Sequence, residues 1–356
     1  MLSFVPYCTA FLFPALAYGA LVGWHQFHWG LPFVAFVLLP LLDQVLPEFS
    51  VSFSKEEEKQ RSAQWLYDVP LYALLPVQWF IIYTLCVETA SMNLEDFNLA
   101  WLGTVFGVGI CCGTFGINVA HELGHRNGRL PQLASKAYLL SSLYMHFIIE
   151  HNFGHHRHVA TKNDPATSRY NQTVYAFWLQ STIGSWNSAW KIEQTRITKK
   201  SLPWWNNQMW HFVSIQALLL IMIGLGFGLF ALLSFVSAAI TGILLLETIN
   251  YLEHYGLERE QTSNGRFERV QPHHSWNCNR SVGRLVLFEL TRHSDHHAHA
   301  KRPYQILKHY ADAPQLPAGY PAMMVLSLFP PLWFAVMNPA LDDYYTEQVD
   351  LMFKQA

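Results

Sequence analysis

Residues 99–125 of the chain read LAWLGTVFGVGICCGTFGINVAHELGH. Residues 99–120 carry no charged side chain, and about 20 mostly apolar residues are enough for a helix to cross the hydrocarbon core of a bilayer. Two histidines, His121 and His125, follow at once and stand four positions apart. Side chains with this spacing lie on one face of a helix, within reach of one metal ion. The stretch therefore predicts a membrane helix that ends in a metal-binding motif.

The composition of the whole chain also indicates a membrane protein. Of its 356 residues, 51% are hydrophobic and 13% are charged, whereas charged residues make up roughly 25% of soluble domains. The net charge of −2 provides no basic field for nucleic acid, so we expect no nucleic-acid partner. The five cysteines show no CxxC spacing and most lie in apolar runs, which argues against a disulfide framework, a zinc ribbon or an iron–sulfur site.

Six apolar stretches are long enough to span a bilayer. They are residues 4–24, 30–47, 69–90, 99–120, 208–228 and 231–251. The first has no basic region before it and no small-residue cleavage site after it, so we expect a retained helix. The last two are joined so closely that we expect a tight antiparallel hairpin. The predicted fold class is an all-α membrane protein, a single domain 1–356 with six transmembrane helices and a cytoplasmic histidine-rich cap.

The distribution of basic residues predicts the orientation. Lys and Arg follow the second, fourth and sixth stretches, whereas the loops 25–30, 91–98 and 228–231 contain neither. Positively charged loops stay on the cytoplasmic side of a membrane. We therefore expect both termini and the polar parts 121–207 and 252–356, with the active site, to face the cytoplasm.

Two further segments contain many apolar residues, but we do not expect them to cross. Residues 133–149 lie between two histidine motifs, and a crossing there would separate the motifs across the bilayer. We expect a shallow or re-entrant helix, buried against its neighbours. Residues 175–196 mix tryptophans with Lys191 and Arg196, which is typical of a helix at the membrane interface.

Three histidine motifs stand on the predicted cytoplasmic side. The first is His121-Glu-Leu-Gly-His125, the second His151-Asn-Phe-Gly-His155-His156 and the third His293-Ser-Asp-His296-His297. Neighbouring residues of a helix point about 100° apart, so the pairs 155–156 and 296–297 can each divide between two ions. His254, in the segment NYLEHYG at 250–256, is a further candidate ligand.

The number and type of ligands indicate the metal. Burying so many imidazoles without an ion would leave many ring nitrogens unsatisfied. Eight or nine imidazoles exceed what one tetrahedral zinc needs and suit two ions with five or six ligands each, for which we favour iron. Each motif also has an acid beside it. These acids (Glu122, Glu150, Glu253 and Asp295) are candidates for ligands or bridges, and we favour a role in orienting the imidazoles by hydrogen bonds.

We expect structural roles for the remaining histidines. A lone histidine is usually a hydrogen-bonded core or interface residue, which we expect of His25, His28, His146, His211 and His309. Four others lie near the motifs but outside their spacing, and we expect a structural or supporting role for them: His158, His273, His274 and His299.

The motifs resemble those of the integral-membrane diiron family that contains alkane hydroxylases, fatty acyl desaturases and sterol hydroxylases. The segments HELGHR at 121–126, EHNFGHHRHVATKNDPATSR at 150–169, NYLEHYG at 250–256 and RHSDHHAHA at 292–300 are most similar to the bacterial alkane 1-monooxygenase branch. The resemblance covers nearly the whole chain.

The resemblance implies a non-haem centre of two iron ions held by nine histidines. Carried over residue by residue, these are His121, His125, His151, His155, His156, His254, His293, His296 and His297. It also implies terminal hydroxylation of medium-chain n-alkanes in the bacterial inner membrane. Dioxygen would be the oxidant and rubredoxin the electron donor, reduced in turn by an NADH-dependent rubredoxin reductase. Because the chain has no CxxC pair, we expect rubredoxin to be a separate protein or a segment outside this sequence.

Two features would follow from such a substrate and donor. An alkane has no polar handle, so we expect a narrow apolar tunnel open to lipid, with Trp24, Phe36, Leu39 and Phe106 as candidates for its floor, although each is as readily an ordinary packing residue. Basic residues near the third motif are candidates for docking an acidic rubredoxin: Arg280, Arg284, Arg292, Lys301 and Arg302.

Three other functions remain open on the sequence. A fatty acyl desaturase or a xylene/sterol-type hydroxylase would use the same chemistry, but desaturases usually have HxxHH as the second motif, where this chain has HxxxHH. A metal transporter would place ligands along a path near the middle of the bilayer. A zinc protease would use HExxH alone, with Glu122 as the base, and would leave the other histidines unexplained.

Overall fold

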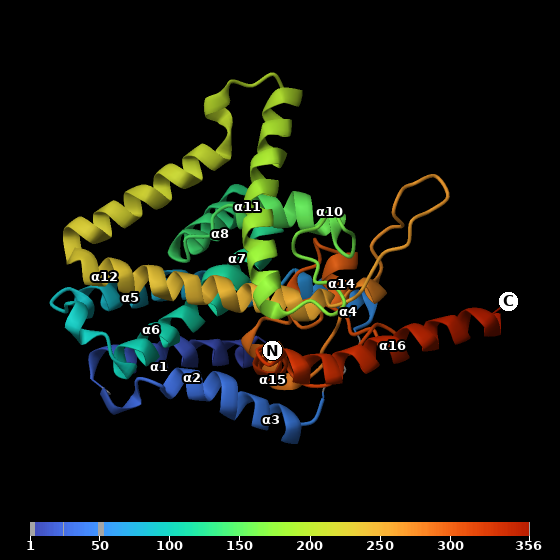
Figure 1. Cartoon of the computed structure of the whole chain (residues 1–356), viewed down its shortest axis with the longest axis horizontal. Helices are drawn as coiled ribbons and strands as arrows, with labels where there is room; N and C mark the ends of the chain where they lie inside the picture. Colours follow the sequence, from blue (N-terminus) through green and yellow to red (C-terminus); the bar gives the residue numbers. More distant parts are fainter. Residues whose placement is uncertain (1–3, 24, 49–52, 356) are drawn as a thin grey trace.

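A computed structural model describes residues 4–23, 25–48 and 53–355. Within these residues the chain is all helical, and the only strand-like pairings are two isolated β-bridges. The helices α1 (Leu12–Val22), α5 (Asp68–Thr89), α6 (Leu99–Cys111) and the second half of α12 (Gln208–His254) run in similar directions through the body of the molecule (Figure 1). The all-α prediction is confirmed.

Four helical segments are long and apolar enough to cross a membrane. They are Val5–Val22, Trp65–Thr89, Leu99–Gly124 and Gln208–His254, with Gly30–Val45 as a shorter apolar helix. The protein is therefore a multi-pass membrane protein. The six predicted stretches fall largely in helices, but the described residues contain four long apolar helical segments, because α12 joins two of the stretches and Gly30–Val45 is shorter than the others.

Gly228 is where the two stretches in α12 meet. Its φ of 86° and ψ of 175° interrupt the helix, in a backbone region that glycine enters without steric cost. α12 turns back sharply there, and its two halves then diverge instead of lying against each other (Figure 1). The predicted turn is correct, whereas the predicted tight hairpin is not.

The segment between the first two histidine motifs is broken. It forms α8 (Arg129–Ser141) and α9 (Phe147–Glu150), with Leu143 at a positive φ of 54° between them. At about 1.5 Å per residue, α8 is too short to cross a bilayer. Residues 133–149 are thus not among the long apolar helices, as predicted.

The next helix, α11 (Val174–Lys199), lies across the direction of the bundle (Figure 1). Thr173 caps it by accepting a hydrogen bond from the backbone N–H of Ala176. Its crosswise course agrees with the interfacial helix predicted for residues 175–196.

A close approach of two helices fixes the position of the first motif. A side chain at Gly242 of α12 would come within 2.6 Å of Cβ of Cys112, so only glycine fits there. Cys112 begins a π-helical turn, η6 (Cys112–Ile117), which leads directly into the short helix α7 (Asn118–Gly124) that carries His121. Such π turns inside helices occur often at functional sites.

The remaining elements are short, except for the C-terminal helix. They are η1 (Val5–Phe11), η2 (His25–Phe27), α2 (Gly30–Phe33), η3 (Val34–Leu38), α3 (Leu39–Val45), α4 (Lys55–Ser62), η4 (Trp65–Tyr67), η5 (Leu94–Asp96), η7 (His151–His155), α10 (His156–His158), η8 (Trp204–Asn206), η9 (Pro272–His274), α13 (Ser281–Val286), α14 (His293–Ala298), η10 (Tyr304–Ile306), α15 (Tyr320–Ser327) and α16 (Pro330–Gln355). α16 extends away from the body of the molecule (Figure 1).

Candidate metal centre

The first motif lies on α7 and is held by its neighbours. Asn118, one turn before His121, donates a hydrogen bond to the carbonyl of Leu287, 2.9 Å away. Ser135 of α8 donates to the carbonyl of Ala120. These bonds join α7 to the segment before the third motif and to α8, so the imidazole of His121 is fixed from both sides.

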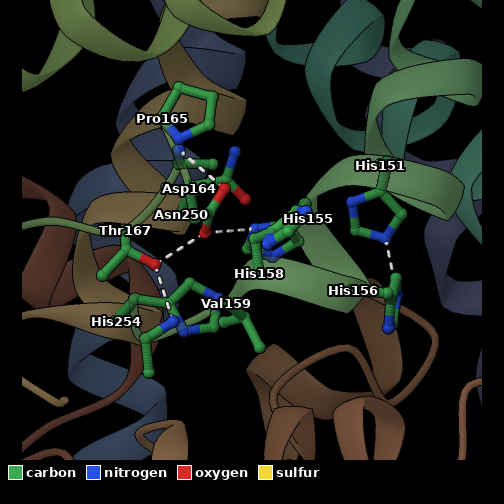
Figure 2. A network of polar contacts seen from close by, with 12 residues as sticks. His151, His155, His156, His158, Val159, Asp164, Pro165, Thr167, Asn250 and His254 are labelled. Atoms are coloured by element: carbon green, nitrogen blue, oxygen red, sulfur yellow. Dashed lines mark hydrogen bonds and ion pairs between the residues drawn. The ribbon is translucent and has the colours of Figure 1, made fainter. Parts of the chain in front are cut away.

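The second motif folds as the π-helical turn η7 (His151–His155). In such a turn the backbone hydrogen bonds join residues five apart. Nε2 of His151 accordingly lies 3.0 Å from Nε2 of His156, as Figure 2 shows for this pair. A regular helix would have aligned His151 with His155, and the sequence alone gave no sign of this difference.

The third motif lies on α14, and His254 ends α12. His293 and His297 are one turn apart on α14, and Nε2 of His293 is 3.3 Å from Nε2 of His254. His296 points elsewhere, with its Nε2 2.8 Å from Nε2 of His121. Neighbouring histidines of the third motif therefore face different partners.

The nine histidines form two groups whose ring nitrogens converge. The five-histidine group consists of His121, His125, His151, His156 and His296. The four-histidine group consists of His155, His254, His293 and His297. The adjacent pairs 155–156 and 296–297 each contribute one residue to each group, and the rings of His156 and His297 stack with centroids 4.5 Å apart. Each group has the composition of a separate metal site.

The spacing of the nitrogens fits a metal ion. Two imidazole nitrogens about 2.1 Å from one ion lie about 3.0 Å apart at an angle of 90° and about 3.4 Å apart in a tetrahedron. In the five-histidine group, Nε2 of His156 lies 3.1 Å from Nε2 of His125 and 3.1 Å from Nε2 of His296. These spacings suit five or six ligands better than four. The residues present therefore fit a metal ion in each group.

The surroundings keep most of these imidazoles neutral. Burial lowers the pKa of His151, His296 and His297 well below the ordinary histidine value, and neighbouring imidazoles lower it further. A neutral imidazole keeps a lone pair for a metal, whereas a protonated one has none. Burial thus prepares these side chains for ligation.

His155 is the exception, because a carboxylate lies beside it. Its Nδ1 donates a hydrogen bond to Oδ2 of Asp164 over 2.9 Å, and Thr167 donates to the same oxygen (Figure 2). Burial alone lowers the pKa of His155, but Asp164 raises it above the ordinary value. With the proton held on Nδ1, Nε2 points toward His297, 3.2 Å away. Asp164 stands in the quoted 150–169 segment, but its distance of nine residues from His155 gave no sign of this contact.

The four acids predicted to orient the imidazoles have different partners. Oε2 of Glu253 lies 3.1 Å from Nε2 of His293, so this acid contacts a histidine of the motifs. Glu122 instead pairs with Arg126 at 2.9 Å, and Asp295 pairs with Arg302 at 2.6 Å. Glu150 is buried beside the motif, and its Oε1 has no hydrogen-bond partner among the described residues. The ion pairs of Glu122 and Asp295 with nearby arginines do not test the orienting role, which stays a prediction for both residues.

A third cluster, made by Glu268, His273 and His274, suits a structural role better than a metal. Nδ1 of His274 accepts the backbone N–H of Gln271 over 2.9 Å, which leaves the ring proton on Nε2. That proton is donated to Glu268, 3.1 Å away. With both nitrogens already used, His274 has no lone pair to offer an ion.

Two of the lone histidines, His28 and His211, lie within hydrogen-bonding distance of a partner, as predicted. Nδ1 of His28 lies 2.6 Å from the Thr104 hydroxyl, and His211 donates to the carbonyl of Trp205. His146 differs, because it is buried and neither ring nitrogen has a hydrogen-bond partner among the described residues. Burial lowers the pKa of His146 to about 3. The side chain of His25 lies outside the described residues.

Two apolar cavities lie between the helices near the histidines. The outer one, of about 350 Å³, opens between α6, α11, α12 and α15 and is lined by Phe106 and Trp178 among others. The inner one reaches Asn118, one turn from His121. Phe36, Leu245 and Met324 line both cavities. Of the predicted tunnel residues, Phe36, Leu39 and Phe106 line these cavities, and Trp24 lies outside the described residues.

The arginines near the third motif are mostly used inside the fold. Arg284 and Arg292 are buried and both pair with Glu289, at 2.7 and 3.3 Å. Arg280 pairs with Glu48 and Arg302 with Asp295. Only Lys301 is exposed and makes no ion pair among the described residues. The prediction that this cluster forms a docking surface is therefore wrong for its buried arginines.

Known proteins share these features. The chain matches the fatty acid desaturase family over residues 98–327, which include all four histidine segments. It is 40% identical to alkane 1-monooxygenase 2 of Pseudomonas aeruginosa, over 88% of this chain and 83% of that protein. It is also 40% identical to alkane 1-monooxygenase 1 of the same organism, over 93% of this chain and 88% of that protein. The chain belongs to the fatty acid desaturase family, in its alkane 1-monooxygenase branch.

A more distant member of the family broadens the range of substrates to consider. The hydroxylase component of a xylene/toluene monooxygenase from Pseudomonas putida is 30% identical over 94% of this chain and 89% of that protein. These relatives are monooxygenases, and the desaturase family match spans both histidine groups. The family predicted from the motifs is thus confirmed, and the chain is a multi-pass membrane monooxygenase.

Proposed function

We propose that the chain hydroxylates the terminal carbon of medium-chain n-alkanes to 1-alkanols at a centre of two non-haem irons. The reaction would consume one dioxygen, two protons and two electrons, and would release the alcohol and one water. Rubredoxin, reduced by its NADH-dependent reductase, would supply the electrons. The observation that carries the proposal is the position of two convergent histidine groups close to an apolar cavity whose lining includes Asn118, one turn before His121.

The ligand set favours a pair of irons over other metals. The five-histidine group provides five nitrogens, and the four-histidine group provides four, with Glu253 beside His293. All-nitrogen groups of this size exceed the needs of zinc, and the chain offers no cluster of thiolates for copper(I). When bound, two ferrous ions would supply the reductive activation of dioxygen.

The side chains around the centre would bind and orient the substrate. An alkane makes no hydrogen bonds, so the apolar walls formed by Phe36, Leu245 and Met324 would hold it by burial, at about 0.8 kcal/mol for each methylene. The inner cavity reaches Asn118, one turn from His121, so an alkane that enters from the outer cavity would present its chain end to the histidines. The absence of polar groups in most of its lining would also exclude water from the reacting carbon.

The topology that we propose has six crossings, with the nine histidines on the cytoplasmic side of the inner membrane. The turn at Gly228 supports two crossings within α12, and Gly30–Val45 would supply the shorter remaining one. The basic residues follow the second, fourth and sixth stretches, which favours the cytoplasmic side for both polar parts. One membrane domain would thus hold the whole site.

Iron content and product identity, measured on the same reconstituted sample, test the proposal. The purified protein should hold about two irons per chain and convert octane to 1-octanol only with dioxygen and reduced rubredoxin. The relative that acts in xylene oxidation makes a methyl-substituted arene the second candidate, so p-xylene and an acyl thioester are tested beside octane. A faster reaction with either of these, or zinc in place of iron, would reject the proposal.

A further inference from the structure

A second pair of cavities lies beside the first and second histidine motifs. The smaller, of about 480 Å³, is lined by His125 and His156 of the five-histidine group. The larger, of about 1080 Å³, lies between the second motif and α11. Both are lined by Asn152, Phe153 and Gln208, so they form one continuous surface, which we call the histidine face.

Basic side chains without partners surround this face. Those that line it, are exposed and make no ion pair among the described residues are Arg157, Lys162, Arg169, Lys191, Lys200 and Lys301. The acids of the same lining, Asp164 and Glu193, are buried and paired with His155 and Arg196. The histidine face is therefore strongly positive, although the whole chain has a net charge of −2.

The orientation of α11 places this face on its outer side. Its residues in the lining include Gly184, Asn187 and Lys191, whereas Trp178 and Trp186 pack against apolar neighbours. At about 100° per residue, these two sets lie on roughly opposite sides of the helix. Because the tryptophan side of α11 packs against the helical body of the protein, the polar cavity lies on the side of α11 that faces away from that body.

An exposed aromatic ring stands in the middle of the basic surface. Phe153 lies within the second motif, between His151 and His155, and its exposed fraction is 64%. An exposed phenylalanine costs solubility and serves no packing purpose there. Aromatic side chains surrounded by charged residues are a common arrangement at the centre of protein interfaces.

His156 connects this face to both histidine groups. It is partly exposed in the smaller cavity, its Nε2 lies within 3.1 Å of three other histidines of its group, and its ring stacks on His297 of the four-histidine group. Any electron carrier seated on the face would thus be separated from the proposed metal centre by one imidazole.

We propose that the histidine face docks a small acidic one-electron carrier, with Phe153 as the apolar contact and the surrounding lysines and arginines as the electrostatic ones. The inference rests on the proposed function, because each hydroxylation with dioxygen consumes two electrons that an outside donor must supply. Redox partners associate through small, transient and charge-complementary interfaces. This surface replaces the cluster near the third motif, where most arginines are already paired.

Rubredoxin, an acidic one-electron protein, serves as the probe. Its affinity for the full chain in nanodiscs is measured for the parent, for the double variant Lys191→Glu/Lys200→Glu and for Phe153→Ala. The control is Arg266→Glu/Arg269→Glu, which makes the same charge change at exposed residues of the 258–270 loop, away from the face. We expect the Lys191/Lys200 variant to raise Kd at least tenfold, Phe153→Ala to raise it severalfold, and the control to leave it within twofold.

Several results would overturn the proposal. One is a Lys191/Lys200 variant that binds rubredoxin as tightly as the parent does. Another is an equal loss of rubredoxin affinity in both double variants, because that would indicate only an effect of net charge. Loss of binding to phosphatidylglycerol vesicles with unchanged rubredoxin binding would assign the face to anionic lipid instead. In the parent, rising salt must also weaken rubredoxin binding. Failure of the parent to oxidise octane with dithionite as reductant would count against the proposed function and not against the docking surface.

Discussion

Nδ1 of His155 donates a hydrogen bond to Oδ2 of Asp164 over 2.9 Å, in the buried interior beside the four-histidine group. The carboxylate also accepts from the hydroxyl of Thr167 and from the backbone N–H of Ala166. Three donors therefore fix Asp164, and Asp164 fixes the tautomer of His155. This contact sets the direction of the one lone pair that His155 has for a metal.

Asp164→Asn should weaken metal binding in the four-histidine group. An asparagine at position 164 cannot accept hydrogen bonds from all three donors, because its NH₂ group must face at least one of them. If the NH₂ faces His155, the ring proton moves to Nε2 and blocks ligation. We expect the iron content to fall from about two toward about one per chain, with a loss of metal affinity of about 10- to 100-fold. Metal analysis of the purified variant measures this.

Thr167→Val is the milder control, since it removes one donor and keeps the carboxylate. Two tightly bound irons in Asp164→Asn would refute the role of Asp164.

Replacement of two adjacent histidines should affect different metals. His296 belongs to the five-histidine group and His297 to the four-histidine group, although they are neighbours on α14. We expect His296→Ala and His297→Ala each to retain about one iron, with different Mössbauer spectra because the remaining ligand sets differ. Identical spectra for the two variants would show that the groups do not act as separate sites. His299→Ala, at an exposed histidine of the same segment, should leave both irons in place.

The sequence predicted which histidines lie close together better than how they divide into two groups. His121 and His125 stand four apart on a short helix, so a regular helical spacing was enough to place them together. The same reasoning pairs His151 with His155, but the π turn η7 pairs His151 with His156, because its backbone hydrogen bonds skip one more residue. A π turn depends on tertiary packing, which no local pattern of residues reveals.

Other contacts could not be read from the spacing of the motifs. Asp295 lies within the third motif but pairs with Arg302, and the acid that bonds His155 of the second motif is Asp164, nine residues away. The apolar stretches, by contrast, were predictable because hydrophobic length alone decides whether a helix can span a bilayer. The features set by composition and local spacing could therefore be predicted, whereas the contacts set by the packing of loops could not.

Leu245→Trp should shorten the preferred alkane. Leu245 lines both apolar cavities, so a larger ring there would fill the passage between them. Each methylene that no longer fits forfeits about 0.8 kcal/mol, which is about fourfold in kcat/KM. Competition among C6 to C12 alkanes, with products identified by chromatography, should show a shift toward the shorter chains. Leu225→Trp makes the same change at an exposed position of α12 and should leave the product profile as it is. An unchanged profile in Leu245→Trp would place the substrate elsewhere.

His146→Phe should stabilise the protein, and more so in acid. His146 is buried, its ring lies edge-on to those of Tyr144 and Trp186, and neither of its nitrogens has a hydrogen-bond partner among the described residues. Replacing an unsatisfied polar ring with an apolar one should add about 1–3 kcal/mol to the free energy of unfolding. Thermal unfolding of the variant and the parent at pH 7.5 measures this gain.

The pH dependence of that gain separates the role of the unpaired nitrogens from simple packing. Burial lowers the pKa of His146 to about 3 in the folded protein, whereas in the unfolded chain it returns to about 6.5. Below pH 6.5 the unfolded state therefore binds a proton that the folded state does not, so His146 costs the parent stability as the pH falls. Between pH 7.5 and 5.5 the advantage of His146→Phe should grow by about 1.4 kcal/mol. The matched change His211→Phe, at an exposed histidine, should show no such growth. A constant difference between His146→Phe and the parent at the two pH values would mean that His146 binds a proton as readily in the folded protein as in the unfolded chain, and would refute the prediction.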